Sequence, residues 1–258
     1  ADCIWYGTYD SDLEKLDQIQ IDAMRVVSGA TAKSNINNLY EELAWPTLHQ
    51  RRLNHSLCMM FKIINGDAPS YLLDLLPSTV GNRSDYTKKL RSANNIDDPL
   101  TKDSLQSLRR SFFPRTIHEW NSIDHSTRNA MNLNSFKTSL SATLPDVNRL
   151  FYYGQRWPSI HHARMRMGCS KLNHHLFNNH LILSPECNCG YHTEDPTHFF
   201  LNCPNYAALR ISMLDTLTPI CRISTGTLLF GDSNCSFDVN IKIFEEVHTF
   251  IVQSHRFD

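Results

Sequence analysis

The sequence predicts a mainly α-helical protein, with a helical bundle followed by an α-rich C-terminal domain. Apolar residues recur at helical spacing in most long segments, as at Leu13, Leu16, Ala23 and Val27. Capping residues precede these stripes, and proline, glycine or asparagine follows them. The chain has 258 residues, of which 41% are hydrophobic and 20% charged. This composition is typical of one large or two modest globular domains.

The first predicted domain, residues 1–77, is a small bundle of helices. Polar residues at positions 10–12 provide capping groups for its clearest helix, and Ser28-Gly29 ends it. Ser34 is expected to cap the second helix and Thr47 the third, with a break at Trp45-Pro46. The predicted helices cover residues 10–27, 36–43, 48–64 and 71–76.

Residues 78–146 are predicted to form a connector. Its first part, residues 78–111, is polar with little periodicity, which indicates a long surface loop or an irregular hairpin. The stretch is rich in cations, and two interpretations stay open: a solvated loop, or a surface that contacts phosphates through Arg109 and Arg110. Aromatic and apolar residues in 111–123 are expected to be core anchors, and an amphipathic helix is expected over 131–144.

Residues 147–258 are predicted to form the C-terminal domain, which opens with an unusual charge pattern. No Asp or Glu occurs between Val147 and Pro185. We expect this segment to present a positive surface that contacts phosphate groups. The candidate contacts are Arg156, Arg164, Arg166 and Lys171.

Two adjacent histidines and several further helices belong to the same domain. His161 and His162 could ligate a metal, but we interpret them as half-exposed helix residues. Short helices are expected on either side of a break at residues 168–170, and longer ones over 206–217 and 239–254. Residues 227–231 are too few for more than a strand or a turn.

A cluster of cysteines and a histidine follows the acid-free segment. Cys187, Cys189, His198 and Cys203 are spaced as C-x-C-x8-H-x4-C. Three thiolates and an imidazole suit tetrahedral zinc, so we predict a small CCHC zinc knuckle there. Chance spacing of buried cysteines is the alternative interpretation, and His192 is a rival fourth ligand.

The knuckle requires a sharp reversal of the chain after its second cysteine. Gly190 stands at that point and can adopt a positive φ. His198 and Cys203 are five residues apart, and we expect them to share one face near a helix start. Phe199 and Phe200 between them are expected to point into a small core.

Charge, apolar runs and cysteine pattern limit which partners and which cellular compartment we expect for this chain. The net charge is −1, which predicts nothing about binding to polyanions. No apolar run approaches the length of about 20 residues that a membrane-spanning helix requires. The cysteine pattern favours a reducing compartment, and no signal peptide is recognised, so we expect an intracellular protein, nuclear or cytoplasmic rather than secreted. The chain begins at Ala1, from which we expect a fragment of a longer protein.

Several blocks of the sequence resemble one protein family in its own order. HHARMRMGCSKLNHHLFNNH, SPECNCG and EDPTHFFLNCPNY are similar to the C-terminal zinc region of LINE-type (non-LTR) retrotransposon reverse transcriptases. LEKLDQIQIDAMRVVSGA, LAWPTLHQRRLNHSLCMMFKIINGDAPSYLLDLLP and SFFPRTIHEWNSI resemble the segment after the polymerase palm of those proteins. The resemblance implies thumb-like helices, a connecting region and a terminal zinc knuckle, with an upstream palm as a partner.

The resemblance does not extend to the catalytic carboxylates of the family. Polymerases hold two metal ions with carboxylates, which in this family include an aromatic-x-Asp-Asp turn. The adjacent pair Asp97-Asp98 lacks that aromatic residue and stands in a polar loop, so we interpret it as a loop. No acid-x-Lys strand of a nuclease follows the knuckle. We therefore expect no enzymatic activity and no catalytic residues.

Two classes of function follow from these patterns. The first is a non-catalytic part of a reverse transcriptase that binds RNA or DNA without base specificity. The second is a zinc-stabilised helical scaffold that binds protein, for which the acidic first helix and the neutral net charge leave room. The salt dependence of nucleic-acid binding distinguishes them.

Overall fold

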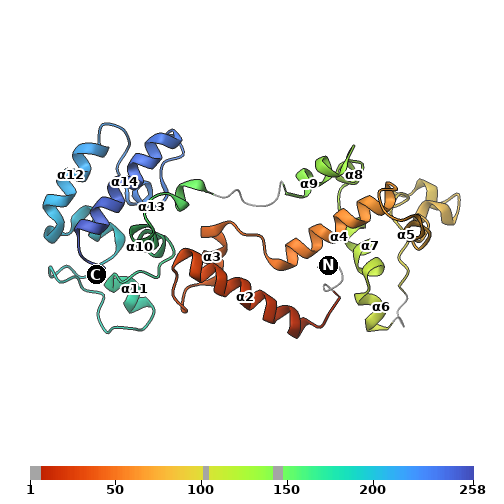
Figure 1. Cartoon of the computed structure of the whole chain (residues 1–258), viewed down its shortest axis with the longest axis horizontal. Helices are drawn as coiled ribbons and strands as arrows, with labels where there is room; N and C mark the ends of the chain where they lie inside the picture. The colour runs from red at the N-terminus through yellow and green to blue at the C-terminus, as the bar shows by residue number, and fades with distance from the viewer. Residues whose placement is uncertain (1–6, 101–104, 142–147) are drawn as a thin grey trace. The chain divides into compact units, whose positions relative to one another are not determined.

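The computed structural model describes residues 7–100, 105–141 and 148–258, and the protein is mainly α-helical, as predicted (Figure 1). The chain divides into two compact units. The first contains Ala1–Ile19 and Pro46–Pro145, and the second contains Gln20–Trp45 and Asp146–Asp258.

This division differs from the three predicted ranges, 1–77, 78–146 and 147–258. The segment Gln20–Trp45 belongs to the C-terminal unit rather than to the N-terminal bundle. The reason is apolar packing, because Met24 and Leu39 from this segment form one buried cluster with Ala163 and Met167. Helix α2 (Asp10–Ser28) contributes residues to both units.

The first unit is built around one long helix. Thr47 caps α4 as predicted, accepting a hydrogen bond from the Gln50 backbone N–H at 3.1 Å. The buried face of α4 packs against α7 and α9, and the rings of Phe61 on α4 and Phe136 on α9 stack with centroids 4.6 Å apart. Trp120 completes this core. The helices of the unit after α2 are α4 (Leu48–Ile64), α5 (Ser70–Asp74), α6 (Gln106–Arg110), α7 (Phe112–Ser122), α8 (His125–Arg128) and α9 (Leu133–Ser141).

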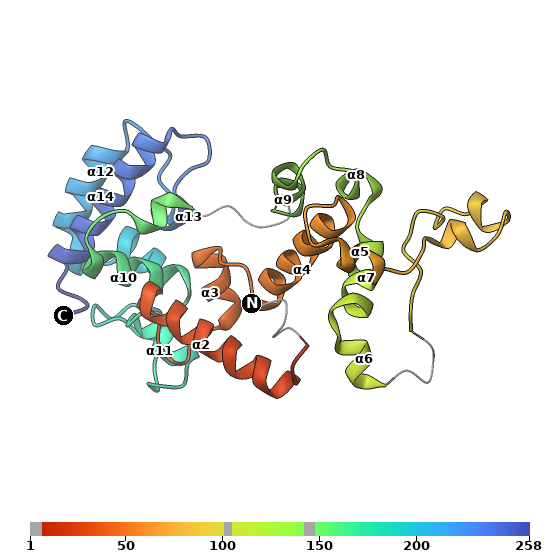
Figure 2. The ribbon, with the colours of Figure 1, turned by 45° about the vertical axis from the view of Figure 1, so that its right-hand side comes forward.

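Residues 78–97 form an irregular hairpin, one of the two forms that the sequence predicts for this stretch. An isolated antiparallel bridge joins Thr79 to Ile96 at its base, and two 3₁₀ turns, η1 (Val80–Arg83) and η2 (Thr87–Lys89), build its outer part. Figure 2 shows this segment extending away from α5 and α7 of the same unit. The predicted helix at 131–144 is α9, and residues 142–144 lie outside the described part of the chain.

The second unit surrounds the last helix of the chain. α14 packs against α10, α12 and α13, and its buried face carries Phe244, Val247 and Phe250. Phe199 and Phe200 insert into the same core, fully buried, as predicted. The elements of this unit are α3 (Ile36–Leu43), η3 (Arg149–Tyr152), α10 (Arg156–Arg166), α11 (Asn173–Asn178), η4 (His198–Asn202), η5 (Pro204–Tyr206), α12 (Ala207–Leu217), α13 (Thr225–Phe230) and α14 (Phe237–Gln253).

Two local predictions are wrong. Asn35, not Ser34, caps α3, since the Asn35 side chain accepts the Asn37 N–H at 2.8 Å while the Ser34 hydroxyl accepts the Thr31 N–H. The segment around residues 227–231 is the short helix α13, not a strand or a turn. Ser224 caps it through the Thr227 N–H at 3.0 Å, and helical burial of Leu228 against α14 stabilises it.

Candidate metal centre

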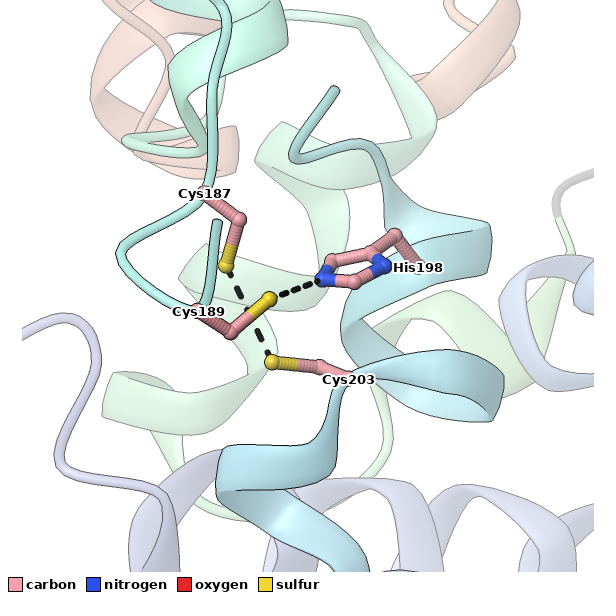
Figure 3. A group of neighbouring side chains, drawn as sticks. All are labelled: Cys187, Cys189, His198 and Cys203. Atoms are coloured by element: carbon pink, nitrogen blue, oxygen red, sulfur yellow. Dashed lines mark hydrogen bonds between the residues drawn. The ribbon is translucent and has the colours of Figure 1, made fainter. Parts of the chain in front are cut away.

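The first half of the cluster is a tight turn that carries two thiols. The Cys187 N–H donates to the Tyr191 carbonyl and the Gly190 N–H donates to the Cys187 carbonyl, each at 2.9 Å. Gly190 has a φ of +89°, as its position after the second cysteine predicts. These bonds hold Cys187 and Cys189 on one side of the turn (Figure 3).

The second half is a π-helical turn that carries the imidazole and the third thiol. In an α-helix, five residues advance about 1.4 turns, so His198 and Cys203 would point in different directions. The element η4 is instead π-helical, and the Cys203 N–H donates to the His198 carbonyl at 2.7 Å. The wider turn brings both side chains to the same face, with Asp195 accepting the His198 N–H at its start.

The four ligand atoms converge at distances that suit a metal ion. They all lie within 4.8 Å of one another. Cys187 Sγ lies 3.8 Å from Cys203 Sγ, and Cys189 Sγ lies 3.2 Å from His198 Nε2. In a tetrahedral zinc site the ligand atoms are about 3.5–3.8 Å apart. The cluster predicted from spacing is thus assembled, and it could bind a metal ion (Figure 3).

The rival ligand His192 stays outside the cluster. Its side chain is exposed and contacts the Tyr191 ring, with centroids 4.2 Å apart. Tyr191 also contacts His198. The two rings stack with an interplanar angle of 1° and with their centroids 4.4 Å apart. This stacking fixes the His198 ring with Nε2 directed toward Cys189, whereas its buried Nδ1 has no partner in the described part of the chain.

Burial keeps two of the cluster's thiols protonated when no metal ion is bound. Burial raises the pKa of Cys187 to about 12 and also raises the pKa of Cys203. Burial lowers the pKa of His198, so its imidazole is the neutral form that ligates metals. Because metals bind thiolates, the arrival of a cation at this cluster would release protons from these buried thiols.

Glu194 lies beside the cluster, and the sequence pattern did not reveal it. It is 3% exposed, its Oε1 lies 3.9 Å from Cys187 Sγ, and it accepts the Asn173 N–H. Arg256 donates to both carboxylate oxygens of Glu194, at 2.7 and 2.6 Å. The pair connects the cluster to the end of the chain.

Arg210 is a second residue that the pattern did not reveal. Its guanidinium donates to the Phe200 carbonyl at 3.0 Å and to the Cys203 carbonyl. The Phe200 carbonyl lies in the π-helical turn and the Cys203 carbonyl directly follows it, where it also accepts the Tyr206 N–H at 3.2 Å, so Arg210 braces the end of this turn. The position of Arg210, seven residues after Cys203, is the one local signal in the sequence that could have indicated this contact.

Arg166 is not a surface cation, which corrects its prediction as a phosphate contact. Its side chain is 2% exposed and forms an ion pair with Glu42, whose side chain is 6% exposed, with Nη2 and Oε1 2.5 Å apart. The guanidinium also lies 4.1 Å from the centroid of the Phe151 ring. A cation buried in this way is not available to phosphate.

The other predicted contacts of the acid-free segment also donate to the protein itself. Arg156 donates to the Val26 carbonyl, Arg164 to the Gly29 carbonyl and Lys171 to the Phe257 carbonyl, at 2.9, 2.6 and 2.7 Å. Within the segment, these four cations therefore pair with backbone carbonyls and, for Arg166, with an acid from a distant segment. Arg156 and Lys171 nonetheless keep exposed surface.

The two predicted contacts of the connector lie at the end of α6. Arg110 pairs with Asp10 at 3.1 Å and donates to the Thr8 carbonyl. Arg109 is half-buried and also has partners within the protein. In the same unit, Asp97 pairs with Arg83, while Asp98 accepts the Leu100 N–H. The pair Asp97-Asp98 thus lies in a loop, as predicted.

His161 and His162 are buried rather than half-exposed, which corrects their interpretation. His162 Nε2 donates to the Leu228 carbonyl at 2.9 Å, and its Nδ1 lies 3.3 Å from His248 Nε2. His161 stacks on Phe257, with centroids 4.8 Å apart. Neither belongs to the metal-ligand cluster. They are core residues, because α10 is covered by α13 and α14.

Comparisons with known proteins add no relative to this description. No family model matches the sequence, and no curated protein and no solved structure matches the chain. Among the residues described, no helix combines the length and the apolar character needed to cross a membrane.

Proposed function

We propose that Cys187, Cys189, His198 and Cys203 bind one zinc ion in a structural centre. The observation that carries this proposal is the convergence of four protein ligands within 4.8 Å. Catalytic zinc sites keep one position for water or substrate, whereas structural sites fill all four with protein ligands. Three sulfurs and one nitrogen are a donor set typical of structural zinc.

The role of this zinc is to stabilise the second unit. Its ligands come from a turn and a π-helical segment, and metal binding in such knuckles is coupled to folding. Phe199 and Phe200 lie between His198 and Cys203 in the sequence and insert beside α14. Zinc therefore holds two core residues of the unit in place.

We further propose that the chain is a non-catalytic, nucleic-acid-binding part of a LINE-type reverse transcriptase. The ordered blocks that resemble the post-palm region and the C-terminal zinc region of that family support this proposal. The polymerase and nuclease carboxylates of the family are missing from the sequence. The partners would be RNA or DNA without base specificity, and a polymerase palm encoded upstream.

Metal analysis tests the zinc proposal. The purified chain should contain about one zinc per molecule. Cys203→Ser should lose it, because a hydroxyl is a poor zinc ligand. Cys58→Ser and Cys235→Ser are matched controls that lie outside the cluster and should retain it. Full zinc content in the Cys203 variant would contradict the assignment.

A binding titration tests the nucleic-acid proposal. Affinity for mixed-sequence RNA and single-stranded DNA should fall steeply as salt increases, because phosphate contacts release counterions. Absence of binding at low salt would favour the second candidate, a protein-binding scaffold. One observation favours that candidate: Arg156, Arg164 and Lys171 all donate to carbonyls of the chain itself.

The proposed lack of catalysis has its own experiment. With template, primer and magnesium, the chain should not incorporate nucleotides, because two-metal chemistry needs a carboxylate cluster. Asp97 is engaged by Arg83, which lowers the pKa of the carboxyl without making it a metal site. Extension that persists through purification and disappears in Asp97→Ala would overturn the proposal.

A further inference from the structure

The hairpin of residues 78–97 is an exposed, cation-rich segment of the first unit. It contains Arg83, Lys88, Lys89 and Arg91 against two carboxylates, Asp85 and Asp97. Those carboxylates are already paired, Asp97 with Arg83 and Asp85 with Lys88 at 2.8 Å. Lys89 and Arg91 are both exposed, and neither side chain makes a hydrogen bond or an ion pair in the described part of the chain.

The base of the hairpin is held firmly. The Asn121 side chain on α7 accepts the Ile96 N–H at 3.0 Å and donates to the Ile96 carbonyl at 2.8 Å, as a neighbouring strand would. The Val80 N–H donates to the Asn95 carbonyl at 2.9 Å, and Arg128 donates to the Asn95 side chain. These bonds present the outer turns in a defined orientation, which lowers the entropy lost on binding.

An aromatic side chain stands next to the unpaired cations. Tyr86 is 74% exposed, and it precedes the η2 turn that carries Lys89. A large aromatic side chain in water loses no packing energy when it stacks on a ligand ring. Cations that follow a backbone and an aromatic ring that accepts a base are the combination that binds single strands without sequence preference.

We propose that this hairpin, through Lys89, Arg91 and Tyr86, is the surface of the first unit that contacts a single-stranded nucleic acid. Lys89 and Arg91 contact phosphates, and Tyr86 stacks on a base. The inference rests on the proposed nucleic-acid-binding function. It moves the contact from the acid-free segment, where Arg156, Arg164 and Lys171 donate to the protein, to Lys89 and Arg91 of the hairpin, whose side chains have no partner in the described part of the chain.

The test compares two double variants with equal loss of charge. One is Lys89→Ala with Arg91→Ala. The control is Lys137→Ala with Lys242→Ala, which removes two exposed lysines elsewhere. Because none of the four side chains has a partner in the described structure, both variants should unfold at the parent's temperature. Fluorescence anisotropy with a mixed-sequence RNA and a single-stranded DNA, over a range of salt concentrations, gives the affinity and its salt slope.

The hairpin variant should lower the magnitude of the salt slope by about 1.4 units, because each lost phosphate contact on a single strand removes about 0.7. The control should keep the parent's slope. Tyr86→Ala should weaken binding at least about fivefold without changing the slope, and Tyr86→Leu, which lacks a ring to stack, should do the same.

The outcomes separate the hairpin from the function it rests on. If the parent binds and both double variants bind equally well, or are weakened equally, the hairpin proposal is overturned and the proposed function stands. If the parent itself does not bind at low salt, the proposed function fails as well. Equal binding of phosphatidylserine vesicles through Lys89 and Arg91 would also overturn the assignment of a nucleic acid as the ligand.

Discussion

Arg256 and Glu194 form a two-pronged ion pair beside the metal-ligand cluster, although 61 residues separate them in the sequence. Glu194 is nearly inaccessible, at 4% side-chain exposure, and its carboxylate approaches Cys187. Arg256 also donates to the Lys171 carbonyl at 3.0 Å. The pair therefore ties the end of the chain to the segments on both sides of the cluster.

Removal of Arg256 should weaken both the fold and metal binding. Arg256→Ala leaves the Glu194 carboxylate buried without a cationic partner, although it still accepts the Asn173 N–H. We expect the free energy of unfolding to fall by about 2–4 kcal/mol, at the low end for a buried pair because the arginine keeps 20% of its side chain exposed. Zinc affinity should fall about 10–100-fold, because residues that support ligands tune the metal. Urea unfolding and competition with a chromophoric chelator measure the two effects.

Two variants control this prediction. Arg256→Lys should recover only part of the stability, because an ammonium cannot make the two parallel hydrogen bonds of a guanidinium. His255→Ala removes an exposed pair with Asp258 and should change the free energy of unfolding by less than about 0.5 kcal/mol. Unchanged zinc affinity in Arg256→Ala would show that the pair does not support the cluster.

Sequence spacing was sufficient to predict the four residues of this cluster but not the residues that support them. Cys187, Cys189 and Gly190 are local, so the turn they form can be deduced from adjacent residues. Glu194 and Arg256 are brought together by tertiary packing, and no period or spacing marks such a pair. The same reason explains Arg166, whose carboxylate partner comes from a segment more than a hundred residues earlier.

The fold was predictable to a similar extent. The helical stripes and the Thr47 cap indicated most helices, because helix periodicity and capping are local. The grouping of Gln20–Trp45 with the C-terminal unit was not predictable, because it depends on which apolar faces meet. The short helix α13 was missed because a five-residue segment with three apolar residues fits a strand, a turn or a helix equally well.

Arg166 should be important for stability rather than for binding. Arg166→Ala leaves Glu42 buried and unpaired, so the free energy of unfolding should fall by about 3–5 kcal/mol. Replacing both partners, Arg166→Met with Glu42→Leu, should recover much of this loss, because neither charge is then buried alone. Chemical denaturation measures each variant.

A charge-matched control is available for this prediction in the same unit. Arg222 is exposed, and Arg222→Ala should change the free energy of unfolding by at most about 0.5 kcal/mol. If the Arg166 and Arg222 variants were equally stable, the buried ion pair would contribute nothing measurable. Unlike a surface contact, Arg166 should show its effect in the absence of any nucleic acid.

The buried histidine pair should make the second unit sensitive to acid. Burial, aided by the Arg166 cation, lowers the pKa of His248 from 6.5 to about 4 and holds the pKa of His162 well below 6.5. Between those values the unfolded chain binds protons that the folded chain does not. These histidines therefore do not reduce the free energy of unfolding above about pH 6.5. Below that pH the free energy of unfolding falls by about 1.4 kcal/mol per pH unit for each histidine.

His248→Gln isolates this effect, because the glutamine amide can still donate to His162 but does not titrate. The variant should lose stability less steeply than the parent between pH 6.5 and 5. Proton competition for the zinc ligands contributes to both proteins and cancels in the comparison. Equal slopes of unfolding free energy against pH would mean that His248 does not titrate on unfolding.

Gly190 should be required for the metal-binding turn because of its backbone conformation alone. Its φ is +89°, and a Cβ built there would meet no atom within 4 Å, so a substitution causes no steric clash. Gly190→Ala should cost about 1–2 kcal/mol of backbone strain. A turn that relaxes to avoid this strain displaces Cys187 and Cys189, so zinc affinity should fall about tenfold for each 1.4 kcal/mol.

Gly168 provides the matched control for this last prediction. It lies in the same unit, has a φ of +68° and also has no atom within 4 Å of a built Cβ. Gly168→Ala should therefore cost similar unfolding free energy while zinc affinity stays close to that of the parent, because Gly168 is not in the metal-binding turn. Competition with a chelator compares the two variants directly. If they lost zinc affinity equally, the loss would come from general destabilisation, and the special role of the Gly190 turn would be refuted.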